Sequence, residues 1–157
     1  MERVTITNHG YANLQAELQQ LKATARPGVI EEISAARDLG DLSENAEYHA
    51  AKEKQGFIEG RITTLEDKIS RANVIDVSKL SGDKITFGAS ITLLDEHTDE
   101  EVVYQIVGED ESSIADGKLS LKAPLARALI GRVVGDSIEV STPRGAKFYS
   151  VEKIQYI

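Results

Sequence analysis

The chain has 157 residues, enough for one large domain or two small ones. Its 26 acidic residues outnumber its 18 basic ones, which argues against a general duplex-binding protein, because such proteins usually present a basic surface. The absence of cysteine excludes disulfides and thiolate metal sites. No stretch approaches the roughly 20 apolar residues that cross a bilayer, and the N-terminus lacks a signal-like apolar run, so we expect a cytoplasmic protein without membrane association.

The first half of the chain has helical periodicity. From about Tyr11, apolar residues follow a 4-3-4 spacing that forms a seam on one helix face. Asn8 is a suitable N-cap, and Gly40 is a suitable C-cap glycine. Pro27 lacks a backbone N–H, so we expect a bend or local break near Arg26 and Pro27.

A second helix is predicted from about residue 42 to 72, with the seam Ile58, Ile62, Leu65, Ile69 and Ala72. Two seams of similar length joined by a short turn predict an antiparallel coiled-coil hairpin over residues 1–77. Residues 12–39 alone would span about 42 Å at the helical rise of about 1.5 Å per residue. We therefore expect part of the hairpin to project.

The second half changes to short β-type segments. Strands are predicted at residues 85–87, 90–94, 102–107, 138–140 and 148–154. The segment TPRG at 142–145 is a turn signal, and Pro124 and Gly131 bracket a short helix. The pattern predicts an α+β globular domain over residues 78–157, and hence an α+β chain.

The turn between the helices, residues 40–48, reads GDLSENAEY and carries Asp41 and Glu44 three residues apart. Such a pair on one face could hold Mg²⁺ if a partner supplied further oxygen ligands. The same segment also has the form of a capping box, with Asp41 as N-cap and Glu44 at N3. The two interpretations are compatible, because capping can leave one carboxylate oxygen free.

Basic residues accompany this acidic turn. Arg37, Lys52 and Lys54 lie within a few turns of it, and Arg26 lies lower on the first helix. They could contact a nucleic-acid backbone, or they could form ordinary ion pairs on a solvated face. Tyr48 and His49 could contact a nucleotide or pack against the first helix.

GDLSENAEY is followed by HAAKE at 49–53 and preceded by Arg26-Pro27 with Ile30. Further along are QGFIEGRI at 55–62, VIDV at 74–77, FGA at 87–89, YQIVG at 104–108 and PLARALIG at 124–131. Together these segments resemble the bacterial Gre transcript cleavage factors nearly from end to end.

The resemblance implies a C-terminal domain similar to the FK506-binding-protein fold, docked on RNA polymerase, and a hairpin inserted into the polymerase secondary channel. Asp41 and Glu44 would help to hold a Mg²⁺ ion shared with the polymerase active site. The polymerase would then cleave the 3′ end of backtracked nascent RNA and rescue arrested complexes. The factor would be a stimulator and not itself an enzyme, and we expect a monomer.

The resemblance also assigns roles outside the acidic pair. Arg37 and Lys52 would hold RNA, and Pro124 and Arg127 would lie near the polymerase docking surface. Ser43 and Lys52 stand where relatives often carry a base and Arg respectively, which favours the less basic branch of the family, with short cleavage products.

Gly56, Phe57 and Gly60 are expected where a helix meets the globular body, since close approach needs small residues.

Three alternatives remain at this stage. A channel-binding inhibitor of the same architecture would block the channel, although such relatives have altered tips. A prolyl isomerase would need an aromatic-lined pocket in the second domain, and fold analogy alone does not support one. A hairpin chaperone would need an exposed apolar grip, whereas the predicted tip is polar.

Overall fold

The computed structural model describes residues 2–157, which form two compact units. Of the described residues, the first unit contains 2–3 and 11–72, and the second contains 4–10 together with 73–157. The chain therefore enters its second unit at residue 4, leaves it for the length of the hairpin, and then returns. In the described residues, no helix is both long enough and apolar enough to cross a membrane.

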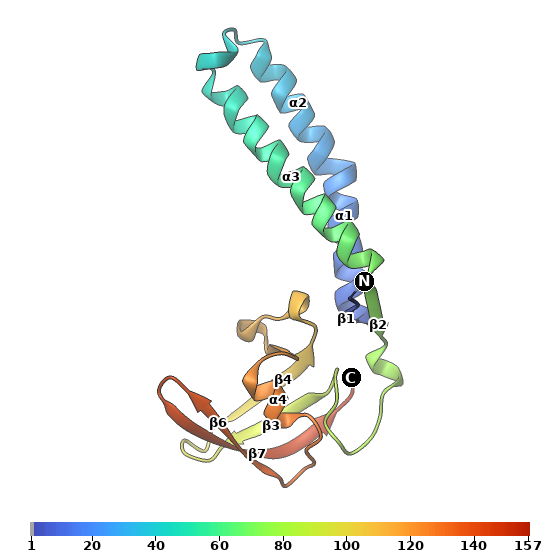
Figure 1. Cartoon of the computed structure of the whole chain (residues 1–157), viewed down its shortest axis with the longest axis vertical. Helices are drawn as coiled ribbons and strands as arrows, with labels where there is room; N and C mark the ends of the chain where they lie inside the picture. Colours follow the sequence, from blue (N-terminus) through green and yellow to red (C-terminus); the bar gives the residue numbers. More distant parts are fainter. Residues whose placement is uncertain (1) are drawn as a thin grey trace. The chain divides into compact units, whose positions relative to one another are not determined.

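The first unit is a helical hairpin, and the predicted α+β chain with an N-terminal hairpin is confirmed (Figure 1). Its first arm contains α1 (Asn8–Gln20), the π-helical segment η1 (Leu21–Ala25) and α2 (Arg26–Arg37). Its second arm is α3 (Ala46–Ser70), which runs beside α2 and in the opposite direction.

Pro27 is accommodated without ending the first arm. The backbone N–H of Arg26 bonds to the carbonyl of Leu21, five residues earlier, so the helix is widened just before the proline. A proline ring clashes with the carbonyl of the preceding turn in a regular α-helix, and a π-type turn makes room for it. The expected local irregularity is present, but the helix continues through it.

The hairpin core changes in size along its length. Val29, Ile58 and Ile62 are buried at its centre, with Leu18 and Leu21 packed against them. Nearer the turn the buried positions are Ala36 and Ala51. The predicted apolar seam thus lies between the arms, and its small residues lie near the tip.

The second unit is built on a five-stranded sheet of order β5-β4-β3-β7-β6 (Figure 1). Its neighbouring strands are antiparallel except for β4 and β5, which are parallel. The strands are β3 (Ser90–Asp95), β4 (Glu101–Val107), β5 (Lys118–Ser120), β6 (Ser137–Thr142) and β7 (Gly145–Gln155). A separate pair joins β1 (Val4–Thr7) and β2 (Ala72–Ile75).

One face of the sheet is apolar because buried residues alternate along its strands. Ile91 and Leu93 of β3 are fully buried and pack in one cluster with Ile138 and Val140 of β6. The helix α4 (Pro124–Leu129) adds Ala126 and Leu129 to the same cluster. The short helix predicted at 124–130 is therefore confirmed, and its buried residues hold it on the sheet.

The predicted strand at 85–87 is wrong. Ile85 is fully buried, but its backbone bonds to Arg132 and Gly131. The neighbouring Lys84 forms an isolated β-bridge with Val133 and does not belong to a strand. Its β-branched and aromatic residues, Ile85, Thr86 and Phe87, made this segment resemble a strand. The short strands β1, β2 and β5 were not predicted, because three or four residues show too little alternation.

Thr7, and not Asn8, caps the first helix. The Thr7 hydroxyl accepts the backbone N–H of Gly10 at 3.0 Å. The Asn8 side chain instead accepts the N–H of Val77 at 3.2 Å, so the predicted cap at Asn8 is wrong. Glu111 binds this segment from the other side, accepting the N–H of Thr7 at 2.7 Å.

The other short helical turns are η2 (Leu42–Glu44), η3 (Val77–Lys79), η4 (Glu109–Glu111) and η5 (Ile114–Asp116).

Candidate functional site at the hairpin tip

The tip begins where the first arm ends. The α2 helix stops at Arg37, and the N–H of Leu39 bonds back to the carbonyl of Ala36 at 3.1 Å. Gly40 follows with φ of 118°, a value that residues with a Cβ rarely adopt. The C-cap of α2 is Asp38, so the predicted C-cap at Gly40 is wrong, and Gly40 instead lets the chain turn two residues later.

Asp41 holds a single 3₁₀ turn, η2, and does not cap the second arm. Its Oδ1 accepts the Ser43 backbone N–H at 3.0 Å and the Ser43 hydroxyl at 2.9 Å. The second arm begins only at Ala46, four residues later than predicted. The expected capping box between Asp41 and Glu44 is therefore wrong as a description of α3.

The cap of α3 is Asn45, which the sequence analysis did not single out. Its Oδ1 accepts the Tyr48 N–H at 3.0 Å, and its Nδ2 donates to the carbonyl of Ala36 at 2.6 Å. One side chain therefore starts the second arm and binds the end of the first. Asn is among the preferred N-cap residues, so its position before a helix-forming run was the available signal.

Two carboxylates at the tip remain available to a ligand. Asp41 and Glu44 are exposed. Within residues 2–157 no hydrogen bond or ion pair engages Oδ2 of Asp41 or either side-chain oxygen of Glu44. The described part of the chain contains no cluster of three or more potential metal ligands. The tip thus offers carboxylate oxygens, and a Mg²⁺ ion bound there would need further ligands from a partner.

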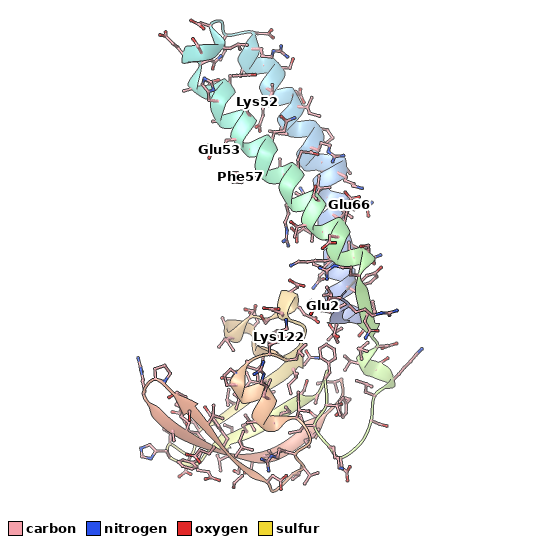
Figure 2. The ribbon with its side chains drawn as sticks, in the orientation of Figure 1. Glu2, Lys52, Glu53, Phe57, Glu66 and Lys122 are labelled. Atoms are coloured by element: carbon pink, nitrogen blue, oxygen red, sulfur yellow. The ribbon has the colours of Figure 1, made fainter. Side chains whose placement is uncertain are left out.

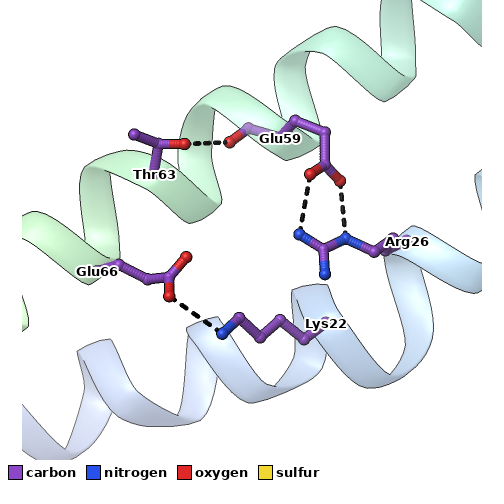
Figure 3. A network of polar contacts seen from close by, with 5 residues as sticks. All are labelled: Lys22, Arg26, Glu59, Thr63 and Glu66. Atoms are coloured by element: carbon purple, nitrogen blue, oxygen red, sulfur yellow. Dashed lines mark hydrogen bonds and ion pairs between the residues drawn. The ribbon is translucent and has the colours of Figure 1, made fainter.

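The basic residues near the tip separate into paired and unpaired groups. Arg26 forms a bidentate salt bridge with Glu59: its Nε and Nη2 each donate to one carboxylate oxygen at 2.8 Å (Figure 3). Lys54 pairs with Glu32 at 2.9 Å. Within the described residues, the Arg37 guanidinium has no hydrogen bond or ion pair, and the Lys52 ammonium bonds only to Gln55.

Helical periodicity places the two less engaged bases on one flank. Arg37 lies eleven residues after Arg26, and Lys52 seven residues before Glu59, so each shares a helix face with a member of that ion pair. Because Arg26 and Glu59 contact each other across the hairpin, Arg37 and Lys52 lie on the same side of it. We call this side the basic flank; the pair Glu32–Lys54 marks the opposite side.

His49 and Tyr48 lie on the first turn of α3. The His49 Nε2 lies 3.2 Å from the carbonyl oxygen of Ser43, so the ring contacts the tip backbone. Tyr48 is half-buried, and its ring meets that of His49 edge to face with centroids 5.6 Å apart. A nucleotide contact by either residue stays a prediction.

The predicted docking residues lie on the second unit. Pro124 and Arg127 are exposed on α4, whereas Ala126 and Leu129 face the core. The helix thus presents both residues at the surface, and their role in docking stays a prediction.

The predicted close approach at Gly56 and Gly60 is wrong. A Cβ placed on either glycine would meet no atom within 4 Å. Phe57 between them is 71% exposed. These residues form an open face of α3, with Phe57 and Glu53 extending away from α2 (Figure 2).

Fold and tip together define a class of protein: a helical hairpin with exposed carboxylates at its turn, continuous with an α+β sheet unit. The family model described as "Transcription elongation factor, N-terminal" matches residues 4–74, and that described as "Transcription elongation factor, GreA/GreB, C-term" matches residues 80–156. The chain belongs to the GreA/GreB family of transcription elongation factors.

Related sequences match this chain over nearly its full length. The chain is 58% identical to transcription elongation factor GreA of Hyphomonas neptunium, covering 99% of each chain. It is 56% identical to the GreA of Rhodospirillum rubrum, again covering 99% of each. Among solved structures, GreA factor homolog 1 of Thermus thermophilus is 28% identical, with 98% of this chain and 99% of that chain covered and a TM-score of 0.45.

Proposed function

We propose that this elongation factor stimulates RNA cleavage by RNA polymerase, with its hairpin in the polymerase secondary channel and its tip at the active centre. The observation that carries the proposal is the pair of exposed carboxylates, Asp41 and Glu44, on one turn between two helices. The substrate would be the 3′ end of backtracked nascent RNA. The polymerase would perform the hydrolysis, and the factor would complete its site.

Asp41 and Glu44 would hold a Mg²⁺ ion shared with the polymerase. Oδ2 of Asp41 and the Glu44 carboxylate suit this hard cation, while Ser43 fixes Asp41 through the other oxygen. Bound there, Mg²⁺ would supply an activated water and charge stabilisation at a leaving oxygen. Asn45 positions the acids indirectly, since it closes the tip on Ala36.

The basic flank would contact the RNA backbone. Arg37 is exposed with its guanidinium unengaged, and Lys52 is exposed on the facing arm. Phosphate contacts of this kind position a nucleic acid without reading its sequence. Pro124 and Arg127 on α4 would contact the polymerase surface outside the channel.

The test is RNA release from a backtracked polymerase complex, comparing the wild type with Asp41→Ala, Asp41→Asn and Asp38→Asn. Asn at position 41 keeps an acceptor for Ser43 but loses the charge that holds the metal. We expect both Asp41 variants to lower the cleavage rate by at least about tenfold, which is the smallest loss of activity typical when a residue that supports a metal site is replaced. Asp38→Asn removes a nearby exposed acid without a proposed ligand role and should cleave normally.

Polymerase binding is measured in parallel, by displacement of a labelled wild-type chain. Wild-type binding without RNA release would favour a channel-blocking inhibitor of the same architecture. Full cleavage by Asp41→Asn would contradict the metal role of Asp41.

A further inference from the structure

The side of the hairpin opposite the basic flank carries a groove near the tip. A groove of about 530 Å³ lies between α2 and α3. Its apolar lining consists of Ala35, Ala36, Leu39, Ala50 and Ala51. The ion-paired Glu32 and Lys54 also line it, which places the groove on their side of the hairpin.

Two large apolar side chains extend this surface. Leu39 lines the groove and is 66% exposed. Phe57 lies seven residues after Ala50, so it continues the same stripe of α3, and Figure 2 draws it pointing away from α2. Leu39 thus lies in the groove, and Phe57 lies about two helical turns beyond it on the same side, past the ion-paired Lys54. Large exposed apolar side chains gathered on one side are a common mark of an interaction site. We call the groove with Leu39 and Phe57 the apolar flank.

Acids border the apolar flank. Glu47 and Glu53 lie three residues before and after Ala50, and both are exposed. Neither carboxylate has a hydrogen bond or ion pair within the described residues, whereas the nearby Lys54 is engaged by Glu32. The unbalanced charge on this side is therefore negative. A phosphate backbone would be repelled here, and a segment with Lys or Arg beside apolar side chains would be complementary.

We infer that the apolar flank is a second docking surface for RNA polymerase, taking a protein segment with an apolar anchor for the groove and a Lys or Arg for Glu47 or Glu53. The inference rests on the proposed function, in which the hairpin lies inside a protein channel. It divides the hairpin between two contacts: RNA on the side of Arg37 and Lys52, and protein on the side of Leu39 and Phe57.

Equilibrium binding of the full chain to core polymerase tests this directly, without RNA cleavage as the readout. Phe57→Ala and Leu39→Ala should each weaken binding about tenfold, as expected for truncating an anchor in an interface. The matched control is Ile30→Ala, which removes an exposed aliphatic side chain (52% exposed) on the side of Arg26 and should bind as the wild type does. Thermal unfolding should be unchanged in the Phe57 variant, because the side chain it truncates is exposed.

A charge variant adds a separate readout. Glu53→Lys should weaken binding, and the loss should shrink as salt is raised, since the repulsion it introduces is screened. Glu53→Gln should have a smaller effect in the same direction.

Each outcome has a distinct meaning. If the wild type binds and cleaves while Phe57→Ala and Leu39→Ala bind equally well, this inference fails and the proposed function stands. If the wild type does not bind polymerase, both fail. The alternative occupant of the apolar flank is a second copy of this chain, which sedimentation of the free protein would detect as a concentration-dependent dimer. If Phe57→Ala abolished that dimer and left polymerase binding unaltered, the flank would be a dimer interface and the proposal would be overturned.

Discussion

At the residue scale, Asn45 joins the two arms of the hairpin through one side chain. It supplies the N-cap acceptor for Tyr48 and a donor to the carbonyl of Ala36, a buried residue near the end of the first arm. Asp41 and Ser43 shape only the turn between them. The orientation of the carboxylates thus depends on a neutral residue that touches no ligand in the proposed mechanism.

Asn45→Ala should lower the free energy of unfolding of the hairpin by about 1–2 kcal/mol, because it removes a cap and leaves the Ala36 carbonyl without its donor. Urea unfolding followed by helical circular dichroism measures this loss. Asn45→Asp keeps the cap acceptor but sets a carboxylate oxygen against the Ala36 carbonyl, so it should also be less stable than the wild type. Equal stability of all three chains would show that the tip closes without this side chain.

At the element scale, ion pairs between the two arms lie along both sides of the seam. Arg26–Glu59 and Lys22–Glu66 lie on one side (Figure 3), and Glu17–Arg61 and Glu32–Lys54 mark the other. The hydrogen bond from Arg26 holds the pKa of Glu59 below its ordinary value of 4.5. Arg61 lowers the pKa of Glu17 in the same way. Exposed pairs of this kind contribute modestly and are screened by salt.

These pKa shifts make hairpin stability depend on acidity. A carboxyl whose pKa is lower in the folded chain stabilises the fold above its unfolded pKa, about 4.5 here, and loses that contribution as the pH falls through its folded pKa. We expect the helical melting temperature to drop as the pH is lowered from 5 toward 3. The double variant Glu17→Gln and Glu59→Gln should show a shallower drop. An identical pH profile in this variant would mean that other carboxyls set the acid response.

Long elements were accessible from the sequence because many residues repeat one signal. The apolar seam of α3 extends over several turns. The short helix α4 was predicted by a different signal, because Pro124 and Gly131 mark its two ends. The segment around Ile85 misled for the opposite reason: it is short, and although the Ile85 side chain packs in the core of the sheet unit, its backbone bonds to Gly131 and Arg132, which no local pattern records.

The tip was predicted in composition but not in geometry. Asp41, Ser43 and Asn45 are all good cap residues within five positions, and local spacing favoured the first of them. The choice of Asn45 depends on the Ala36 carbonyl, nine residues earlier, which only the closed hairpin brings within 2.6 Å. The flank shared by Arg37 and Lys52 likewise depends on the Arg26–Glu59 contact.

At the scale of the whole molecule, the hairpin is inserted between two paired strands. β1 precedes α1, β2 follows α3, and the two strands pair with each other. Residues 4–10 therefore belong to the sheet unit although they are separated from it by the hairpin in sequence. The contact that holds this segment is local to the sheet unit and centres on Glu111.

Glu111 binds three donors. Its carboxylate accepts the N–H of Thr7 at 2.7 Å, the hydroxyl of Thr7 at 2.5 Å and the N–H of Gly108 at 3.0 Å. Gly10 is buried against the same carboxylate, and a Cβ there would collide with it. A charged acceptor that holds residues 4–10 against the loop after β4 should contribute more to the stability of the sheet unit than an exposed ion pair does.

Glu111→Ala should therefore lower the unfolding free energy of the sheet unit by about 2 kcal/mol, since hydrogen bonds to a charged group contribute about 1.5–3 kcal/mol and part of each loss is recovered by water. The matched control is Glu109→Ala, which removes an exposed acid of the same turn that pairs with Lys122 at 3.0 Å and should change stability by well under about 1 kcal/mol. Urea unfolding of the full chain compares the two variants, followed by tyrosine fluorescence with Tyr149 of β7 as the reporter in the sheet unit. Equal stability would mean that β1–β2 pairing alone holds residues 4–10. A larger loss in Glu111→Ala would show that this carboxylate holds residues 4–10 against the loop after β4.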